Sequence, residues 1–177
     1  MHLWQLYSFL ALAFSLFSTA AASSDALNVT VLGAANNHST LECWSLEPGF
    51  TVSPQAGTAG SEVLSLGLLG GTNASYVVVP AEFDGGGHNA PAVQWVVFLS
   101  GLAHITLPHS KHEAWIRGGK HGTILALDTA AVSADGHNTT YPSRDITIGL
   151  QLPIAGGKIP EHEFLHMGAC RHEELEL

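Results

Sequence analysis

Short apolar segments separated by turn residues constrain the fold of this chain more than any other feature of its sequence. No helical period lies between these segments. Their even spacing predicts an all-β sandwich or barrel rather than an α/β fold. Seven segments are rich in β-branched or aromatic residues and bounded by Gly, Pro, Asn or Asp: 27–32, 64–68, 76–79, 93–99, 103–107, 123–127 and 146–152.

Segment 93–99 is expected to be a central, buried strand, because both of its faces are apolar except at Gln94. A buried amide needs hydrogen-bond partners. Gln94 is therefore either a structural hydrogen-bonding residue or part of a site. We expect Ser100 and Gly101 to join this strand to the next one as a tight hairpin. The one predicted helix begins at Pro160, because proline suits the first turn of a helix.

The first 22 residues are expected to be a signal peptide. An apolar run, 3–17, is followed by the small residues 18–22. The run is shorter than the roughly 20 residues that span a bilayer. Residues 23–177 then form a single domain with its own hydrophobic core. Four N-x-S/T sequons support export and N-glycosylation, at Asn28, Asn37, Asn73 and Asn138.

The chain has two cysteines, Cys43 and Cys170. In an oxidising compartment they are expected to form one disulfide, with two buried free thiols as the alternative. This disulfide would close a loop of more than 100 residues. On the chain-entropy model such a loop corresponds to about 4–5 kcal/mol of stability.

Acidic residues outnumber basic ones by 15 to 6, and no Lys or Arg occurs before Lys111. A chain with so few cations lacks the basic surface that binds a phosphate backbone. It is equally unsuited to anionic lipid surfaces. We therefore expect no nucleic-acid partner, and no membrane partner once the signal peptide is removed.

Residues 162–166 spell H-E-x-x-H, and His172 falls where the extended zinc-protease motif places a third histidine. The motif requires a stable helix that carries both histidines and the glutamate base on one face. The helix expected here meets Gly168 within about eight residues. We therefore do not expect a metalloprotease. On such a helix His162 and His166 would share a face and offer at most a weak surface metal site.

Residues 85–101, GGGHNAPAVQWVVFLSG, resemble the first motif of the cupins. That motif runs His-x-His, three or four residues, Glu, six residues, Gly. His88, Gln94 and Gly101 occupy the positions of its first histidine, its glutamate and its glycine. Ala90 stands where the cupins have their second histidine.

Residues 121–140 resemble the second cupin motif, with His137 in the place of its histidine. The stretch between Asp128 and His137 is longer than in that motif. The resemblance covers about residues 75–153 and is closest to small single-domain cupins, including secreted fungal ones. It implies a jelly-roll β-barrel.

The resemblance also implies a metal site, because cupins hold a metal on three histidines and one glutamate in the mouth of the barrel. This chain keeps only His88 and His137 of that set. Ala90 cannot coordinate a metal, and Gln94 is a neutral, weaker oxygen ligand. A divalent ion normally takes three or four protein ligands. Asp128 would either complete the set or orient His137 as a hydrogen-bonded carboxylate.

Three interpretations of these residues stay open. In the first, His88 and His137 weakly bind a divalent metal of unknown identity. In the second, no cofactor is present, the two histidines act as proton donor and acceptor, and Gln94 orients the substrate. In the third, the polar side chains are hydrogen-bonded parts of the core.

The sequence as a whole predicts a secreted, glycosylated, disulfide-bonded protein with an all-β, cupin-type jelly-roll β-barrel and a short C-terminal helix or tail. We expect it to act on a small organic molecule by acid–base chemistry, as a dehydratase, cyclase or isomerase does in natural-product metabolism. Its catalytic residues would be His88, Gln94, Asp128 and His137. The alternatives are a metal-dependent cupin dioxygenase or other oxidoreductase, and a non-catalytic secreted ligand-binding protein or effector. The oligomeric state stays open, with a dimer as one option.

Overall fold

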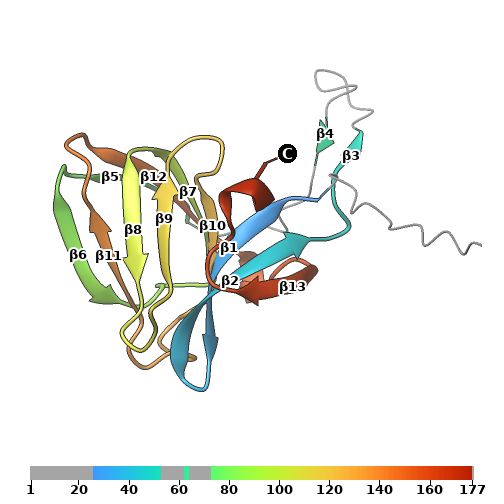
Figure 1. Cartoon of the computed structure of the whole chain (residues 1–177), viewed down its shortest axis with the longest axis horizontal. Coiled ribbons are helices and arrows are strands. Elements are labelled where there is room, and N and C mark those ends of the chain that lie inside the picture. The colour runs from blue at the N-terminus through green and yellow to red at the C-terminus, as the bar shows by residue number, and fades with distance from the viewer. Residues whose placement is uncertain (1–25, 53–61, 64–72, 177) are drawn as a thin grey trace, which may run out of the picture.

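The computed structural model describes residues 26–52, 62–63 and 73–176 (Figure 1). Within these ranges the chain forms strands and two short 3₁₀ turns, and no α-helix. The strands are β1 Asn28–Ala35, β2 His38–Leu46, β3 Thr51–Val52, β4 Glu62–Val63, β5 Ser75–Val79, β6 Phe83–His88, β7 Gln94–Ser100, β8 Leu102–Thr106, β9 Glu113–Arg117, β10 Thr123–Ala126, β11 His137–Tyr141, β12 Thr147–Pro153 and β13 His162–Met167. The 3₁₀ turns are η1 Ala155–Gly157 and η2 His172–Glu174.

Six of the seven predicted strand segments overlap strands β1, β5, β7, β8, β10 and β12. The seventh, 64–68, and the predicted signal peptide, 1–22, lie outside the described residues. The strand assignment from sequence is thus confirmed wherever the structure describes it, although it omitted β2, β3, β4, β6, β9, β11 and β13.

The eight strands β5 to β12 form a jelly roll. They associate as nested antiparallel pairs: β5 with β12, β6 with β11, β7 with β10, and β8 with β9. Wrapping this ribbon of pairs gives one sheet with the order β10-β7-β12-β5 and a second with the order β6-β11-β8-β9. The two sheets face each other in Figure 1. The predicted all-β jelly-roll fold is confirmed.

The predicted hairpin at Ser100 and Gly101 is wrong. β7 lies in the larger sheet and β8 in the smaller one, so these two residues carry the chain from one sheet to the other. Gly101 makes this crossing with φ 84°. A Cβ at this position would also collide with Thr147, so both the backbone conformation and the available space require glycine.

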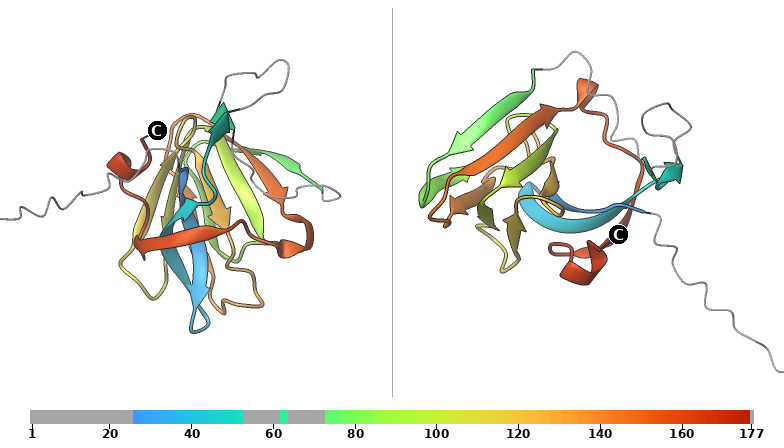
Figure 2. Two further views of the ribbon diagram at one scale, coloured as in Figure 1. Left: turned by 90° about the vertical axis from the view of Figure 1, so that its right-hand side faces the viewer. Right: turned by 90° about the horizontal axis from the view of Figure 1, so that it is seen from above.

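Three further strands extend the larger sheet beyond β10. β1 pairs with β10 in parallel, β2 pairs with β1 antiparallel, and β13 pairs with β2 at the edge. The long strands β1 and β2 curve across one side of the jelly roll (Figure 2). They turn into each other at Asn36 and Asn37, whose φ values of 52° and 66° are those of a type I′ hairpin turn.

The helix expected from Pro160 onward is wrong, because residues 162–167 form strand β13. His162 stacks on Trp44 of β2 with ring centroids 3.5 Å apart and an angle of 6° between the ring planes. Pairing with β2 and this aromatic contact outweigh the weak helical tendency of so short a segment. The two histidines therefore share no helix face, and the surface metal site that such a face would offer does not form.

The predicted disulfide is confirmed. Cys43 in β2 and Cys170 after β13 are bonded, with both residues buried and a sequence separation of 127. The backbone N–H of Cys170 also donates a hydrogen bond of 3.1 Å to the hydroxyl of Thr30 in β1. The C-terminal segment is thus fixed to the strands at the edge of the larger sheet.

A small charged network secures the end of this segment. His166 Nε2 lies 3.0 Å from Glu174 Oε2, and the Arg171 guanidinium also binds this carboxylate. Arg171 first, and His166 in addition, lower the pKa of Glu174 to about 2. The backbone carbonyl of Met167, followed by Glu174, raises the pKa of His166 above its ordinary value of 6.5.

The tail network is expected to depend on pH in both directions. The contribution of Glu174 to stability is present above its ordinary pKa of 4.5 and is lost as the pH falls toward about 2. The contribution of His166 is complete below 6.5 and is lost as the pH rises through its higher folded-state pKa. An NMR titration should place the midpoint of His166 above 6.5, and Glu174→Gln should lower it. An unchanged midpoint in the variant would show that the ion pair does not form.

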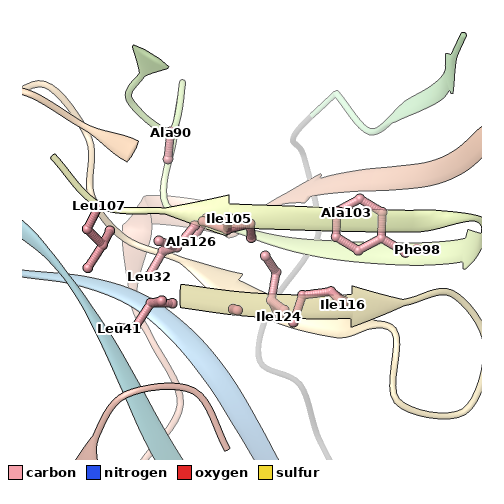
Figure 3. Packing of buried hydrophobic residues seen from close by; sticks show 11 residues of the cluster. Leu32, Leu41, Ala90, Phe98, Ala103, Ile105, Leu107, Ile116, Ile124 and Ala126 are labelled. Carbon is pink, nitrogen blue, oxygen red and sulfur yellow. The ribbon is translucent and has the colours of Figure 1, made fainter. Parts of the chain in front are cut away.

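The main hydrophobic core lies between the two sheets of the jelly roll (Figure 3). Alternate residues of β8, β9 and β10 point into it, as the period of a half-buried strand requires. The cluster consists of Leu32, Leu41, Ala90, Phe98, Ala103, Ile105, Leu107, Ala114, Ile116, Ile124 and Ala126. The remaining alternate residues of the larger sheet form a second cluster on its opposite face, around Trp95: Val29, Val31, Trp44, Leu46, Leu125 and Ile154.

Candidate functional site

One pocket opens into the space between the two sheets, with a volume of about 80 Å³. A water molecule needs roughly 10–15 Å³ of such space, so the pocket has room for a small molecule. Its apolar lining residues are Leu32, Ala90, Pro91, Val96, Phe98, Ile105, Ile124 and Ala126. Its polar lining residues come from both sheets: Gln94 and Gln151 from the larger one, and His88, His137, Thr139 and Tyr141 from the smaller one. Three of the four predicted catalytic residues therefore face the same cavity.

His88 and His137 are directly opposite each other on neighbouring strands. They are register partners in the β6–β11 pair, and their ring centroids lie 4.5 Å apart with 58° between the ring planes. His88 is exposed at the end of β6, whereas His137 is 5% exposed at the start of β11. The Nδ1 of His88 is 3.1 Å from the carbonyl oxygen of Gly86. That contact makes Nδ1 the donor and leaves Nε2 of His88 free to act toward the pocket.

Asp128 does not line the pocket but lies behind His137. It is fully buried, and its Oδ2 is 2.7 Å from His137 Nδ1. The same oxygen accepts a hydrogen bond of 2.7 Å from Ser39 Oγ. Because a carboxylate only accepts, the proton of the His137 contact lies on Nδ1, and Nε2 carries the free lone pair. Asp128 thus orients His137, which is one of the two roles that the sequence left open for it.

The stretch between Asp128 and His137, which is longer than in the second cupin motif, supplies parts of this network. Ser133 is buried, and its Oγ is 2.7 Å from Ser39 Oγ. Asn89, the neighbour of His88, donates its side-chain amide to the carbonyl oxygens of Asp128 and Ser133, at 3.0 Å in each case. The extra residues therefore hold the segments that carry the two histidines against each other.

Gly136 lets the chain enter β11 close to His88. It has φ 65°, and a Cβ on it would collide with the backbone carbonyl of His88.

We expect Gly136→Ala to lower the free energy of unfolding by about 2 kcal/mol or more, because the cost of a positive φ adds to the cost of the backbone collision. It should also displace His137 from His88. Chemical denaturation measures the first effect, and a matched Gly119→Ala variant, whose Cβ would meet nothing within 4 Å, controls for positive φ alone. Equal losses in the two variants would contradict the steric argument.

Gln94 is 3% exposed and lines the pocket, as the position of the cupin glutamate implies. Its side-chain amide borders the cavity, and its atoms are not among the fully buried polar atoms that lack a partner. An amide in this position can exchange hydrogen bonds with a ligand or water in the cavity. Its direction into the cavity favours a role in binding over a purely structural one.

Three polar pocket residues were not predicted: Thr139, Tyr141 and Gln151. The first two follow His137 at two-residue intervals on β11, so the period of a strand places them on the same face. That signal is present in the sequence once β11 is recognised as a strand. Burial raises the pKa of Tyr141, so its phenol stays protonated at neutral pH and can donate a hydrogen bond.

The residues at this pocket do not fit a tightly bound metal. Groups of three His, Cys, Asp or Glu ligand atoms occur elsewhere among the described residues, but none of them includes His88 or His137. Ala90 is part of the apolar lining, and Asp128 is already bonded to Ser39 and His137. Two imidazoles and one amide remain, which is fewer and weaker donors than a divalent ion takes.

The predicted glycosylation sites differ in accessibility. Asn37 and Asn73 are exposed, and Asn138 is half-buried in β11. Asn28 is part-buried, and its Nδ2, the atom that would carry a glycan, donates a hydrogen bond of 2.8 Å to the carbonyl oxygen of Glu174. The folded chain thus presents Asn37 and Asn73 best.

A scan of the chain against protein-family models found no match, and a search of curated proteins found no relative. The jelly roll and the pocket therefore carry the functional argument by themselves. In the described ranges no helix is long and apolar enough to cross a membrane.

Proposed function

We propose that this chain is a secreted, cupin-like enzyme that acts on a small organic molecule by metal-independent acid–base chemistry. One observation carries the proposal: the buried Asp128–His137 pair lies beside His88 at a pocket between the sheets. Buried carboxylate–imidazole pairs that face a cavity are typical of general bases. The disulfide and the sequons support secretion and glycosylation.

His137 is the better base of the two histidines. When its Nε2 takes a proton from substrate, the ring becomes positively charged, and the carboxylate of Asp128 at 2.7 Å stabilises that charge. His88 has only a backbone carbonyl at its Nδ1 and is exposed. As the imidazolium, with protons on both ring nitrogens, it gives its Nε2 proton to the substrate and recovers one from solvent.

The proton balance suits a dehydratase or an isomerase. In an isomerisation, the proton that His137 removes from one atom is matched by the proton that His88 gives to another. In a dehydration, His88 protonates the leaving hydroxyl, which departs as water while His137 holds the proton taken from carbon. Both reactions leave the redox state of the substrate unchanged, and neither needs a co-reactant.

The pocket lining supports a class of substrate. No Lys or Arg is among the lining residues, so the pocket has no permanent cation to pair with a carboxylate or phosphate. Its apolar lining favours a hydrocarbon or aromatic portion. The amide of Gln94 and the phenol of Tyr141 would bind a carbonyl or hydroxyl group. The substrate is thus a small, uncharged molecule with one polar end.

Screening of small neutral carbonyl and hydroxyl compounds by NMR tests the proposal. Compounds that bind should show contacts to the imidazole protons of His88 and His137, and none to the exposed His112. Mass spectrometry of the same mixtures should then detect an isomer, or a product lighter by one water. Binding without turnover would contradict the enzyme and favour a carrier protein. Failure of every compound to bind the pocket would contradict both.

A further inference from the structure

A second histidine cluster lies outside the pocket, where three separate segments meet. His38 begins β2, His109 follows β8, and Asp135 precedes β11. Asp135 Oδ2 is 3.4 Å from His38 Nδ1 and 2.8 Å from His109 Nε2, and the two rings have centroids 4.6 Å apart. One ligand atom from each residue lies within 4.8 Å of the other two.

A hairpin turn and a backbone hydrogen bond position the segments that carry these three side chains. The turn at Asn36 and Asn37 places His38 at the tip of the β1–β2 hairpin. The N–H of Ala134 donates a hydrogen bond of 2.9 Å to the carbonyl oxygen of Asn37. This bond fixes the tip of the hairpin to the loop that carries Asp135. Next to His38, Ser39 is anchored in the buried network around Asp128.

The donor set and its spacing match a zinc-type ion. Zinc binds imidazole nitrogen and carboxylate oxygen at about 2.0–2.2 Å in a tetrahedron, which places neighbouring donors roughly 3.3–3.5 Å apart. The two distances from Asp135, 3.4 and 2.8 Å, are close to that spacing. All three donor atoms lie within 4.8 Å of one another, and rotation of the exposed side chains would bring them to the tetrahedral geometry. Two imidazoles and one carboxylate leave a fourth position for water.

A comparison with a similar cluster in the C-terminal segment favours this one. There, His121 and His172 approach Glu176, but Lys120 Nζ lies 2.5 Å from the same carboxylate. An ammonium group on the carboxylate opposes a cation. The ion pairs of Asp135 in the described structure are with His38 and His109 alone.

We propose that His38, His109 and Asp135 form a surface site for a divalent transition metal of the zinc type. The ion joins the tip of the β1–β2 hairpin to two loops of the jelly roll. The site is separate from the pocket and makes no use of His88 or His137. A metal bound by this chain therefore has a location that the cupin motifs do not indicate.

Titration of the chelator-treated, full secreted chain with zinc chloride by calorimetry at neutral pH tests this site. We expect one zinc ion per chain at the tightest step, with affinity at least about 10-fold weaker in His109→Ala and in Asp135→Ala. His112→Ala, an exposed histidine outside the cluster, and His172→Ala, in the other cluster, should bind as the unaltered chain does. Cobalt(II) in place of zinc should give the intense visible absorption of tetrahedral coordination.

Three results of the zinc titration would overturn the proposed metal site. Absence of zinc binding, or binding that Asp135→Ala leaves unchanged, would overturn the proposal. Loss of binding in His172→Ala alone would move the site to the C-terminal cluster and equally overturn it. Because both cluster histidines and the aspartate have exposed side chains, the variants are expected to fold, and circular dichroism without metal confirms this.

Discussion

Replacing both Cys43 and Cys170 with alanine is expected to lower the free energy of unfolding by about 5 kcal/mol. The bond spans a separation of 127 residues, and the chain-entropy model gives about this value for a closed loop of that length. Most single domains have only about 5–15 kcal/mol of total stability, so the loss is a large share of the whole. The parts of the chain that depend most on the disulfide are β2 and the segment after β13.

Urea denaturation followed by tryptophan fluorescence measures this loss, because Trp95 and Trp44 are buried in the second core cluster. Reduction of the unaltered protein should reproduce the effect of the double variant. A change below about 1 kcal/mol would show that the contacts of β13 with β2 hold the C-terminal segment without the covalent bond.

Replacing His137 with alanine should reduce the rate of turnover by about 10²–10⁴-fold, the usual contribution of a general base. Asp128→Asn should lower the rate by a similar factor. An amide in place of the carboxylate can donate to His137 Nδ1 and so favour the tautomer with its proton on Nε2. That tautomer cannot accept a proton from substrate at the pocket.

The two variants need a control for indirect structural effects, since Asp128 is fully buried and also bonds Ser39. Ser39→Ala removes a partner of the same carboxylate but leaves the His137 contact in place, so it should lower stability more than turnover. His112→Ala should change neither. Retention of full activity in His137→Ala would refute the acid–base mechanism.

The sequence predicted the fold through its strand period. β7 and β10 could be assigned as strands from sequence because they are apolar on both faces. Central strands covered by two core clusters have this pattern. β6 was missed because three of its six residues are glycines. β11, with the sequence HNTTY, has polar residues that face the pocket rather than a hydrophobic core.

In the C-terminal segment, local sequence does not predict the secondary structure. Nothing within residues 160–167 distinguishes a short helix from a strand, because the deciding contacts are with β2 and with Trp44, more than 100 residues earlier. The H-E-x-x-H letters therefore suggested a helix face that does not exist. His162 serves in an aromatic stack, and His166 in an ion pair.

Three of the four candidate site residues lie together as expected, while their catalytic roles stay predictions. The resemblance to the cupin motifs aligned His88, Gln94 and His137 with cupin positions, and the structure brings all three to one pocket. The contact between Asp128 and His137 depends on a loop whose course the sequence does not specify. Ser39, on a strand that was not predicted, was missed for the same reason.

The most direct test of the central claim is the tautomeric state of His137, measured by long-range ¹H–¹⁵N NMR with and without a pocket ligand. The acid–base mechanism requires that Nδ1 carries the proton shared with Asp128 and that Nε2 is unprotonated. It also predicts that the Nε2 signal shifts when a neutral carbonyl compound binds, while the signals of the exposed His112 stay in place. A proton on Nε2 in the free protein, or an Nε2 signal that no pocket ligand moves, would contradict it.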